Sequence, residues 1–311
     1  MMMFTDTSRG ASIAKDPAVV EFCGRFFLYY TIVPKAGGLR IGIAQSEDLD
    51  SWEKIGEIGP LSPCDRNGLG APGAIVLKGQ IHLFYQTYGN REKDAICHAT
   101  SSDGVNFLPD PSNPVFAPTG NWNCGRAIDA DVIADGNRLL LYFSTRDPTF
   151  KIQMTGVASA PLSSGFHRDD WTQLCDAAIL RPELPWEQNC IEASALCRYG
   201  GKLYMFYGGA YNCAPQQIGC AVSDDGLHWH RVSDEPTLPC GSPGQWNSSE
   251  SGHPFVFEDR NGLLHLFFQG SADQGKSYYL SRAAIRWRDG IPQIRTEQPP
   301  AGDVLGAAPE A

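Results

Sequence analysis

Short apolar segments separated by turns recur along the whole chain, and the 3.6-residue spacing of an amphipathic helix is absent from it. The most apolar segments align as five copies of one element: GRFFLYY (24–30), GQIHLFY (79–85), NRLLLYF (137–143), GKLYMFY (201–207) and GLLHLFF (262–268). Each copy follows a turn rich in Gly, Asp or Asn, and each turn follows another short strand-like segment. A strand of small residues comes after each copy, and turn-like segments such as SSDGVNF lead towards a fourth strand.

This repeat predicts the fold. Each unit takes about 60 residues, and four-stranded sheets repeated around an axis are typical of a β-propeller. The second strands are apolar on both faces, as expected where every sheet packs between two neighbouring sheets. We therefore predict an all-β, five-bladed β-propeller of four antiparallel strands per blade, one domain over residues 1–311, with blades starting near residues 16, 71, 129, 192 and 253. A pair of stacked sheets is the alternative, and it would show a regular alternation of apolar and polar positions.

Acidic residues stand at the start of several first strands, which are the strands nearest the axis of a propeller. The first residue of such a strand should point into the central funnel, and the five copies read Asp16, Ala71, Asp129, Glu192 and His253. Three carboxylates that converge on one cleft raise one another's pKa and reduce stability, so packing alone does not explain them. The pattern indicates a functional site, whereas the alternative is that each carboxylate only caps a turn. Asp131 lies two residues beyond Asp129 on the same strand face and is the alternative third carboxylate.

The order and spacing of these residues resemble glycoside hydrolase family 43 and related five-bladed propeller glycosidases over nearly the whole chain. The matching segments are Asp16-Pro17, AIDADVIADG with Asp129, Glu192, Gly252-His253 and the closing RAAIRWRDGIP. The chain departs from the family at Glu192-Ala193-Ser194, where Glu-Gly-Pro is usual, and at Gly70-Ala71-Pro72-Gly73, where Trp-Ala-Pro-Asp is frequent. These departures leave the substrate specificity open.

The resemblance implies an inverting glycoside hydrolase that cleaves arabinofuranosides, xylosides or related short saccharides. Asp16 would then be the general base and Glu192 the general acid, while Asp129 would position Glu192 and keep its pKa raised. One alternative is a retaining fructosidase-like hydrolase or transferase, in which Asp16 would be the nucleophile. The two carboxyl groups are about 6.5–9.5 Å apart in inverting enzymes and about 5–5.5 Å apart in retaining ones. A non-catalytic carbohydrate-binding propeller is the second alternative.

Several residues near the first strands are candidates for binding the substrate. Arg126 and Asn189 could bind sugar hydroxyl groups, and Arg282 in the closing segment is a further candidate. Trp122 and Trp186 each precede a first strand by a few residues and could stack against a sugar ring. Packing between blades would explain the same spacing of the two tryptophans.

His253 could contact a calcium ion or another cation on the axis, as the resemblance implies, or could bond to a neighbouring backbone group or carboxylate. The sequence shows no tight metal-binding cluster, and the expected reaction requires no cofactor. The triplet Arg146-Asp147-Pro148 resembles one that related fructosidases use to stabilise the transition state. Here the triplet follows a second strand instead of opening a first strand, so we expect it to be a loop.

Composition limits the partners and the compartment. The net charge of −10 and the absence of a Lys/Arg run argue against nucleic acid and anionic membrane partners, so a carbohydrate is the expected partner. No run of about 18 apolar residues occurs, and the first residues lack the apolar region of a signal peptide, so we expect a cytoplasmic protein. The ten cysteines form no CxxC pair, and we expect most to be free, with Cys97, Cys197 and Cys220 buried on strands. The sequence leaves the oligomeric state open.

Overall fold

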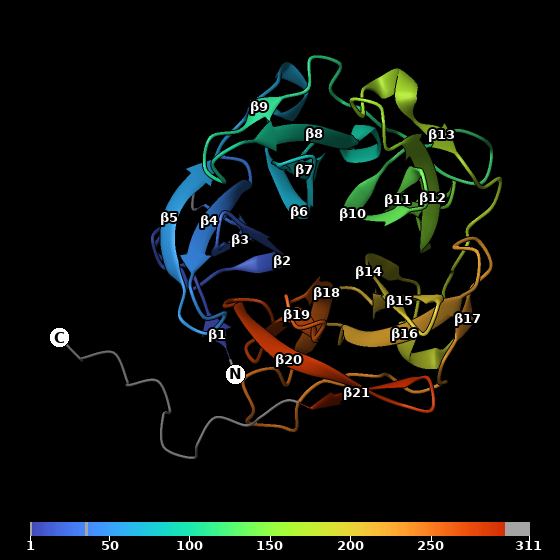
Figure 1. Cartoon of the computed structure of the whole chain (residues 1–311). Helices are drawn as coiled ribbons and strands as arrows, with labels where there is room; N and C mark the ends of the chain where they lie inside the picture. The colour runs from blue at the N-terminus through green and yellow to red at the C-terminus, as the bar shows by residue number, and fades with distance from the viewer. Residues whose placement is uncertain (1, 35–36, 296–311) are drawn as a thin grey trace.

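Five antiparallel sheets surround a central axis in the computed structural model, which describes residues 2–34 and 37–295 (Figure 1). The first blade consists of β2 (Lys15–Phe22), β3 (Arg25–Ile32), β4 (Arg40–Ser46) and β5 (Glu53–Ile58). The second consists of β6 (Leu69–Leu77), β7 (Gln80–Thr87), β8 (Ile96–Ser101) and β9 (Leu108–Pro109). The third consists of β10 (Ile128–Asp135), β11 (Arg138–Arg146), β12 (Gln153–Pro161) and β13 (Thr172–Gln173). The fourth consists of β14 (Ile191–Tyr199), β15 (Lys202–Gly209), β16 (Gln217–Ser223) and β17 (His230–Arg231).

The fifth blade closes the ring with segments that are far apart in the sequence. It contains β18 (Glu250–Glu258), β19 (Leu264–Ser271) and β20 (Tyr279–Arg288). The outer edge of β20 pairs antiparallel with β1 (Met3–Phe4) at residues 280–281 and with β21 (Ile291–Arg295) at residues 284–288. The segment before the first blade therefore completes the last one.

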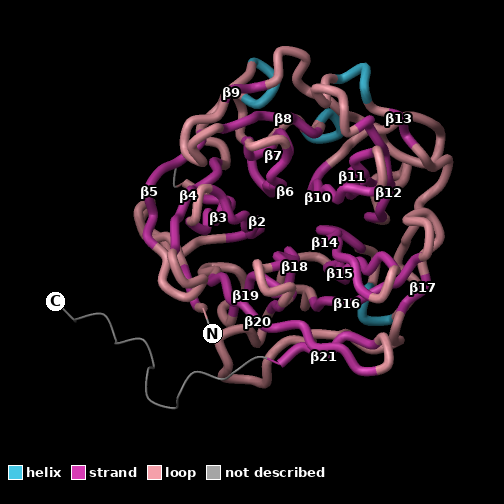
Figure 2. The backbone as a smooth tube through the Cα atoms, viewed as in Figure 1, coloured by secondary structure: helices cyan, strands magenta, loops and turns pink. Residues whose placement is uncertain are grey.

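Helical structure in the described chain is confined to four short 3-10 turns outside the blades (Figure 2). They are η1 (Pro63–Asp65), η2 (Arg91–Lys93), η3 (Arg168–Asp170) and η4 (Pro185–Glu187). The predicted five-bladed, all-β propeller of four-stranded antiparallel blades is confirmed. Among the residues that the structure describes, no helix is long and apolar enough to cross a membrane.

The second strands are buried on both faces, as their apolar sequences predict. All but the first one or two residues of β3, β7 and β15 are buried, and β19 is buried throughout. Their side chains fill the space between adjacent blades, so each sheet is sandwiched between its neighbours. This packing fixes the position of the inner strands that face the axis.

Each first strand contains a β-bulge near its start, where two residues face one residue of the second strand. The bulged pairs are Asp16-Pro17, Ala71-Pro72, Asp129-Ala130, Ala193-Ser194 and His253-Pro254. The first member of every pair has a positive φ, between 43° and 53°. A non-glycine residue in this left-handed region costs about 1–2 kcal/mol, so a local interaction must compensate for the strain at each bulge.

A hydrogen bond to the preceding blade supplies this compensation. The backbone N–H of each positive-φ residue donates to a side-chain oxygen, and we call the five contacts the bulge ring. The bulge ring pairs Asp16 with Gln269 (2.8 Å), Ala71 with Thr31 (2.8 Å), Asp129 with Gln86 (2.9 Å), Ala193 with Ser144 (3.2 Å) and His253 with Gln216 (3.2 Å). An unpaired buried N–H costs about 1–3 kcal/mol, so these contacts stabilise the bulges and join neighbouring blades.

Glu192 lies one residue before the position that the repeat alignment gave it. The bulge residue of the fourth blade is Ala193, because Glu192 still pairs with Gly208 in the regular ladder. The spacing of apolar residues does not reveal a one-residue bulge, so the alignment placed Glu192 in phase with the other first strands. The Glu192 side chain nevertheless reaches the axis, where it contacts His253.

The cysteine prediction is confirmed, since all ten cysteines lie in the described part of the chain and are free. Cys97, Cys197 and Cys220 are buried as expected. Titration of the denatured, unreduced protein with a thiol reagent should therefore find ten thiols per chain. In the native protein the exposed Cys23 should react first, because the reagent reaches its thiolate without unfolding. A count well below ten in the denatured protein would contradict this prediction.

Candidate active site

The bulges converge on a narrow pocket at the axis of the propeller. Its walls include Asp16, Asp129, Ser194 and His253, and its free space of about 20 Å³ is enough for about one water molecule. Within the described residues, Asp129 Oδ2 and Ser194 Oγ are buried without a hydrogen-bond partner. Buried polar atoms nearly always have partners, so these two atoms are available to hydrogen-bond a water molecule or a polar group in the pocket.

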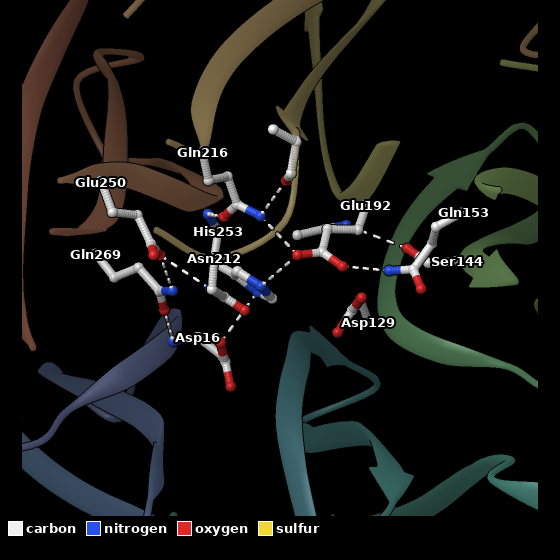
Figure 3. A network of polar contacts seen from close by, with 12 residues as sticks. Asp16, Asp129, Ser144, Gln153, Glu192, Asn212, Gln216, Glu250, His253 and Gln269 are labelled. Atoms are coloured by element: carbon white, nitrogen blue, oxygen red, sulfur yellow. Dashed lines mark hydrogen bonds and ion pairs between the residues drawn. The ribbon is translucent and has the colours of Figure 1, made fainter. Parts of the chain in front are cut away.

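His253 lies between two of the predicted catalytic carboxylates (Figure 3). Its Nδ1 is 3.0 Å from Asp16 Oδ1, and its Nε2 is 3.2 Å from Glu192 Oε1. Burial lowers the pKa of His253, but the charge of Asp16 and the contacts with both carboxylates outweigh burial and raise the pKa well above its usual value. The ring is therefore an imidazolium that presents one N–H to each carboxylate at neutral pH.

Asp16 is ionised at neutral pH. Burial raises the pKa of Asp16, but the positive charges of His253 and Lys15 outweigh burial and hold the pKa well below its usual range. The bulge ring fixes the Asp16 backbone through Gln269. An ionised and rigidly held carboxylate in a pocket is suited to accept a proton from a bound water molecule.

Both carboxyl oxygens of Glu192 are bound by side-chain amides. Oε1 accepts a hydrogen bond from Gln216 Nε2 at 2.6 Å, and Oε2 accepts one from Gln153 Nε2 (Figure 3). Burial raises the pKa of Glu192, but the hydrogen bond and charge of His253 and the Gln216 hydrogen bond outweigh burial, so the pKa is lowered. Without substrate, Glu192 is therefore a carboxylate.

Asp129, and not Glu192, is the carboxyl group of this pair whose pKa is raised. Burial and the charges of Glu192 and Asp16 raise the pKa of Asp129 to about 7, against the opposing charges of His253 and Arg126. The expectation that Asp129 would keep the pKa of Glu192 raised is reversed in the structure without substrate. The reason is the donors, because Glu192 accepts three N–H groups while Asp129 Oδ2 has none among the described residues.

Asp131, the alternative third carboxylate, is held by the next blade. Its Oδ2 accepts a hydrogen bond from the Leu196 N–H at 2.8 Å, and burial raises its pKa to about 7. Asp131 and Phe255 also line a second cavity of about 290 Å³, so they form the floor between this cavity and the axial pocket. This placement favours Asp129, whose charge interacts with Glu192 and His253, as the third carboxylate.

The two predicted hydroxyl-binding residues lie at different depths. Arg126 is close enough to the third carboxylate for its charge to lower the pKa of Asp129, and its Nε is 3.7 Å from Asp94 Oδ2. Asn189 is exposed, and its backbone C=O accepts a hydrogen bond from the Gln153 N–H at 2.9 Å. The structure thus brings Arg126 into the site and leaves Asn189 beside it.

The two candidate tryptophans pack against their own blades. Trp186 stacks on Tyr207 with ring centroids 6.0 Å apart, and its Nε1 donates to the Asp234 carbonyl at 2.9 Å. Trp122 packs against the apolar core cluster that contains Phe143. Both placements favour packing over sugar stacking.

The structure does not bring Arg282 to the axial pocket. Arg282 lies on β20, a third strand, and third strands are remote from the axis (Figure 1). Its guanidinium donates to Asp50 Oδ1 at 2.6 Å and contacts His265 Nδ1 at 3.1 Å. These contacts join the fifth blade to a turn of the first blade.

The residues around His253 do not fit a cation bound directly by its ring. Both ring nitrogens already face carboxylates, so neither has a free lone pair for a metal. The described part of the chain also contains no group of three or more His, Cys, Asp or Glu side chains that could hold a metal ion.

Sequence reasoning missed Lys15, Gln153 and Gln216. Lys15 directly precedes Asp16, and its charge lowers the pKa of that carboxyl group. The two glutamines stand at the starts of third strands, where a polar residue resembles an ordinary solvent-exposed strand end. The one available signal was that a glutamine opens or precedes the apolar third strand in two neighbouring blades.

Comparisons with known proteins identify the family of the chain and agree with its fold. The family model of glycosyl hydrolases family 43 matches residues 10–292, and no curated protein matches the chain. Among solved structures, a thermostable family-43 glycoside hydrolase has a TM-score of 0.74 and 22% identity, over 95% of this chain and 98% of that chain. An endo-1,4-β-xylanase from Bacteroides thetaiotaomicron has a TM-score of 0.72 and 20% identity, over 91% and 94% of the two chains. A GH32 β-fructofuranosidase from Bombyx mori has a TM-score of 0.70 and 14% identity, over 92% of this chain and 63% of that chain.

Proposed function

The chain belongs to family 43 of the glycosyl hydrolases and is a glycosidase, and we propose that it cleaves arabinofuranosides, xylosides or related short saccharides with inversion. The observation that carries this proposal is the position of Asp16 and Glu192 on opposite sides of the His253 ring, at 3.0 and 3.2 Å. A ring between the two carboxyl groups favours the wider separation of about 6.5–9.5 Å, which leaves room for a water molecule. The family and the xylanase among the similar structures support the substrate class.

In this proposal Asp16 is the general base. Its ionised carboxylate accepts a proton from a water molecule, and the oxygen of that water attacks the anomeric carbon while the glycosidic bond breaks. The leaving oxygen receives its proton from Glu192. Each turnover therefore places one proton on Asp16 and removes one from the acid side of the pocket, and solvent restores both.

Glu192 and Asp129 share the proton of the acid side. The forms with the proton on either residue have the same total charge, so one macroscopic pKa belongs to the pair. The raised pKa of Asp129 and the lowered pKa of Glu192 mean that, without substrate, a proton on this pair favours Asp129. Any substrate contact that weakens the N–H donors on Glu192 raises its proton affinity and draws the proton to the residue that faces the leaving group.

A panel of aryl arabinofuranosides and aryl xylosides, in both anomeric forms, tests the proposal. The protein should release the aryl group from at least one of them, and proton NMR of the first product formed should show inverted configuration. A product with retained configuration would support the fructosidase-like alternative. Failure to cleave any glycoside would support a non-catalytic carbohydrate-binding propeller.

The variants Asp16→Asn and Glu192→Gln should separate the base from the acid. Asp16→Asn should lower kcat by about 10²–10⁴-fold on every substrate, because water needs the base whatever the leaving group. Glu192→Gln should have an effect of that size only on poor leaving groups, since activated aryl groups depart with little protonation. Rates across a series of aryl leaving groups measure the difference. Equal responses of the two variants would overturn the assignment of roles.

Asp129→Asn should move the basic limb of the pH profile of kcat/KM to lower pH. In the wild type this limb should lie near the Asp129 pKa of about 7, above which the pair has lost its proton. Asparagine holds no proton, and Glu192 alone has a lowered pKa, so the acid form is lost earlier as pH rises. Asp131→Asn is the matched control on the same strand and should leave the limb in place. A shift with Asp131→Asn alone would make Asp131 the third carboxylate.

A further inference from the structure

A chain of two hydrogen bonds connects Arg146 to Glu192. Arg146 ends β11 and pairs with Gln153, the first residue of β12, in the antiparallel ladder. Arg146 Nε donates to Gln153 Oε1 at 3.0 Å. Gln153 Nε2 in turn donates to Glu192 Oε2, as Figure 3 shows. The next residue, Asp147, accepts backbone N–H groups of its own turn, so Asp147 and Pro148 form the loop expected at the end of the strand. Of the triplet, only the arginine reaches towards the site.

The guanidinium of Arg146 is held by contacts other than Gln153. It lies over the Phe150 ring at 4.5 Å and over the Tyr211 ring at 5.3 Å. Stacking of this kind fixes the plane of a guanidinium, and an arginine keeps its proton at every accessible pH. Arg146 is therefore a fixed donor at the end of β11.

This fixed donor sets the orientation of the Gln153 amide. A guanidinium N–H can only donate, so the amide oxygen must face Arg146 and the NH₂ group must face Glu192. Gln216 is oriented in the same way, because its Oε1 accepts a hydrogen bond from the backbone N–H of His253 at 3.2 Å. Its NH₂ group then donates to Glu192 Oε1 at 2.6 Å and to the Ala210 carbonyl at 2.9 Å.

Counting donors leaves one lone pair of Glu192 unused. A carboxylate offers about four lone-pair sites, two on each oxygen. Oε1 accepts from Gln216 and faces His253 Nε2 at 3.2 Å, so both of its sites are taken. Oε2 accepts from Gln153 and has no second N–H or O–H donor among the described residues, although the thiol of Cys190, a weak donor, also contacts this carboxyl group. The remaining site on Oε2 is where a proton can sit before it is transferred.

We propose that Arg146 and Gln153 are positioning residues for the general acid, which hold Glu192 with one lone pair of Oε2 free for the transferred proton. The inference rests on the proposed function, because it specifies which oxygen of Glu192 protonates the leaving group. Gln153 would have two effects. It orients Oε2, and it stabilises the ionised form of Glu192, so that the proton is released readily to the substrate.

Other charged and titratable groups also face Glu192. They are Lys15 on β2, Asp129 on β10, His253 on β18, Cys190 just before β14, and Tyr211 after β15. A change at Gln153 leaves all five in place. A changed pH profile in a Gln153 variant would therefore report the lost N–H donor.

Gln153→Leu tests the proposal directly. In an Asp129→Asn background, where the basic limb of kcat/KM reports Glu192 alone, loss of a hydrogen bond to the ionised form raises the pKa of the acid, so this limb should move up by about one pH unit. Loss of orientation should lower kcat about tenfold or more on poor leaving groups and much less on activated aryl glycosides. Gln153→Glu keeps a partner for Arg146 and removes the donor, so it should shift the limb in the same direction even if Gln153→Leu folds poorly.

Arg146→Met should act through Gln153. Without the guanidinium the Gln153 amide is free to rotate. The basic limb of kcat/KM should therefore again move to higher pH, by no more than the shift in Gln153→Leu. Because the two residues form one unit, the double variant should show the shift of Gln153→Leu alone. Arg25 and Gln45 form the same kind of pair on the first blade, with Nη1 to Oε1 at 3.3 Å. Arg25→Met and Gln45→Leu are therefore matched controls and should change neither the limb nor the leaving-group response.

Three outcomes would overturn the inference. A rise in KM for Arg146→Met with an unchanged limb would make Arg146 a direct substrate ligand. Additive shifts in the double variant would mean that Arg146 and Gln153 act separately. If the basic limb is unchanged in both Gln153→Leu and Gln153→Glu, Gln153 does not position the general acid. A fully active wild type would still support the proposed function in that case. A wild type that cleaves no glycoside would overturn the proposed function itself.

Discussion

The backbone N–H at each first-strand bulge donates to a side-chain oxygen of the preceding blade, and the geometry of the axis depends on this contact. The bulge places two residues opposite one, which turns the first of them into a strained, positive-φ conformation that faces the axis. Strain of this kind persists only where the surroundings determine it fully. Five repeats of the contact, at 2.8–3.2 Å, satisfy the N–H groups and hold each blade against the next.

The bulge ring also explains the division of labour in the pocket. Asp16, Asp129 and His253 occupy bulge positions, so their backbones are fixed by the same contacts that assemble the propeller. Glu192 lies one residue outside the ring and lacks this support. Its side chain is instead held by the amides of Gln153 and Gln216. The carboxyl group of Glu192 is thus oriented by donors from other strands and not by the bulge ring.

Gln216 joins the two arrangements. In the other blades the acceptor of the bulge ring lies on the second strand, and the fourth blade has Gly208 at the equivalent position of its second strand. A Cβ at Gly208 would lie 3.0 Å from the Gln216 side chain. The absence of a side chain lets Gln216, from the start of the next strand, take the place of the ring acceptor. The Gln216 amide then accepts the backbone N–H of His253 through its oxygen and donates to Glu192 through its nitrogen. A change at Gly208 would therefore disturb the blade contact and the acid together.

The sequence was sufficient to predict the blades and the converging carboxylates, because apolar second strands and acidic first strands repeat in register. It could not place Glu192 correctly, because a one-residue bulge changes no residue type. It also predicted a raised pKa for Glu192 instead of Asp129. The donors on Glu192 come from Gln153 and Gln216, which resemble solvent-exposed strand ends in the sequence. Arg282 was misplaced for a related reason: a motif match carries no information on the distance of a strand from the axis.

The charges of the pocket largely cancel, which bears on what can bind there. At neutral pH Asp16 carries one negative charge, the Asp129–Glu192 pair carries one while it keeps its proton, and His253 carries one positive charge. Lys15, whose charge acts on the same carboxylates, supplies the second positive charge. A neutral ligand group adds no unpaired charge to this site. The shared proton is what makes the balance possible, because two ionised residues on the acid side would leave the pocket with an excess negative charge. The raised pKa of Asp129 therefore keeps the charge of the pocket closer to zero.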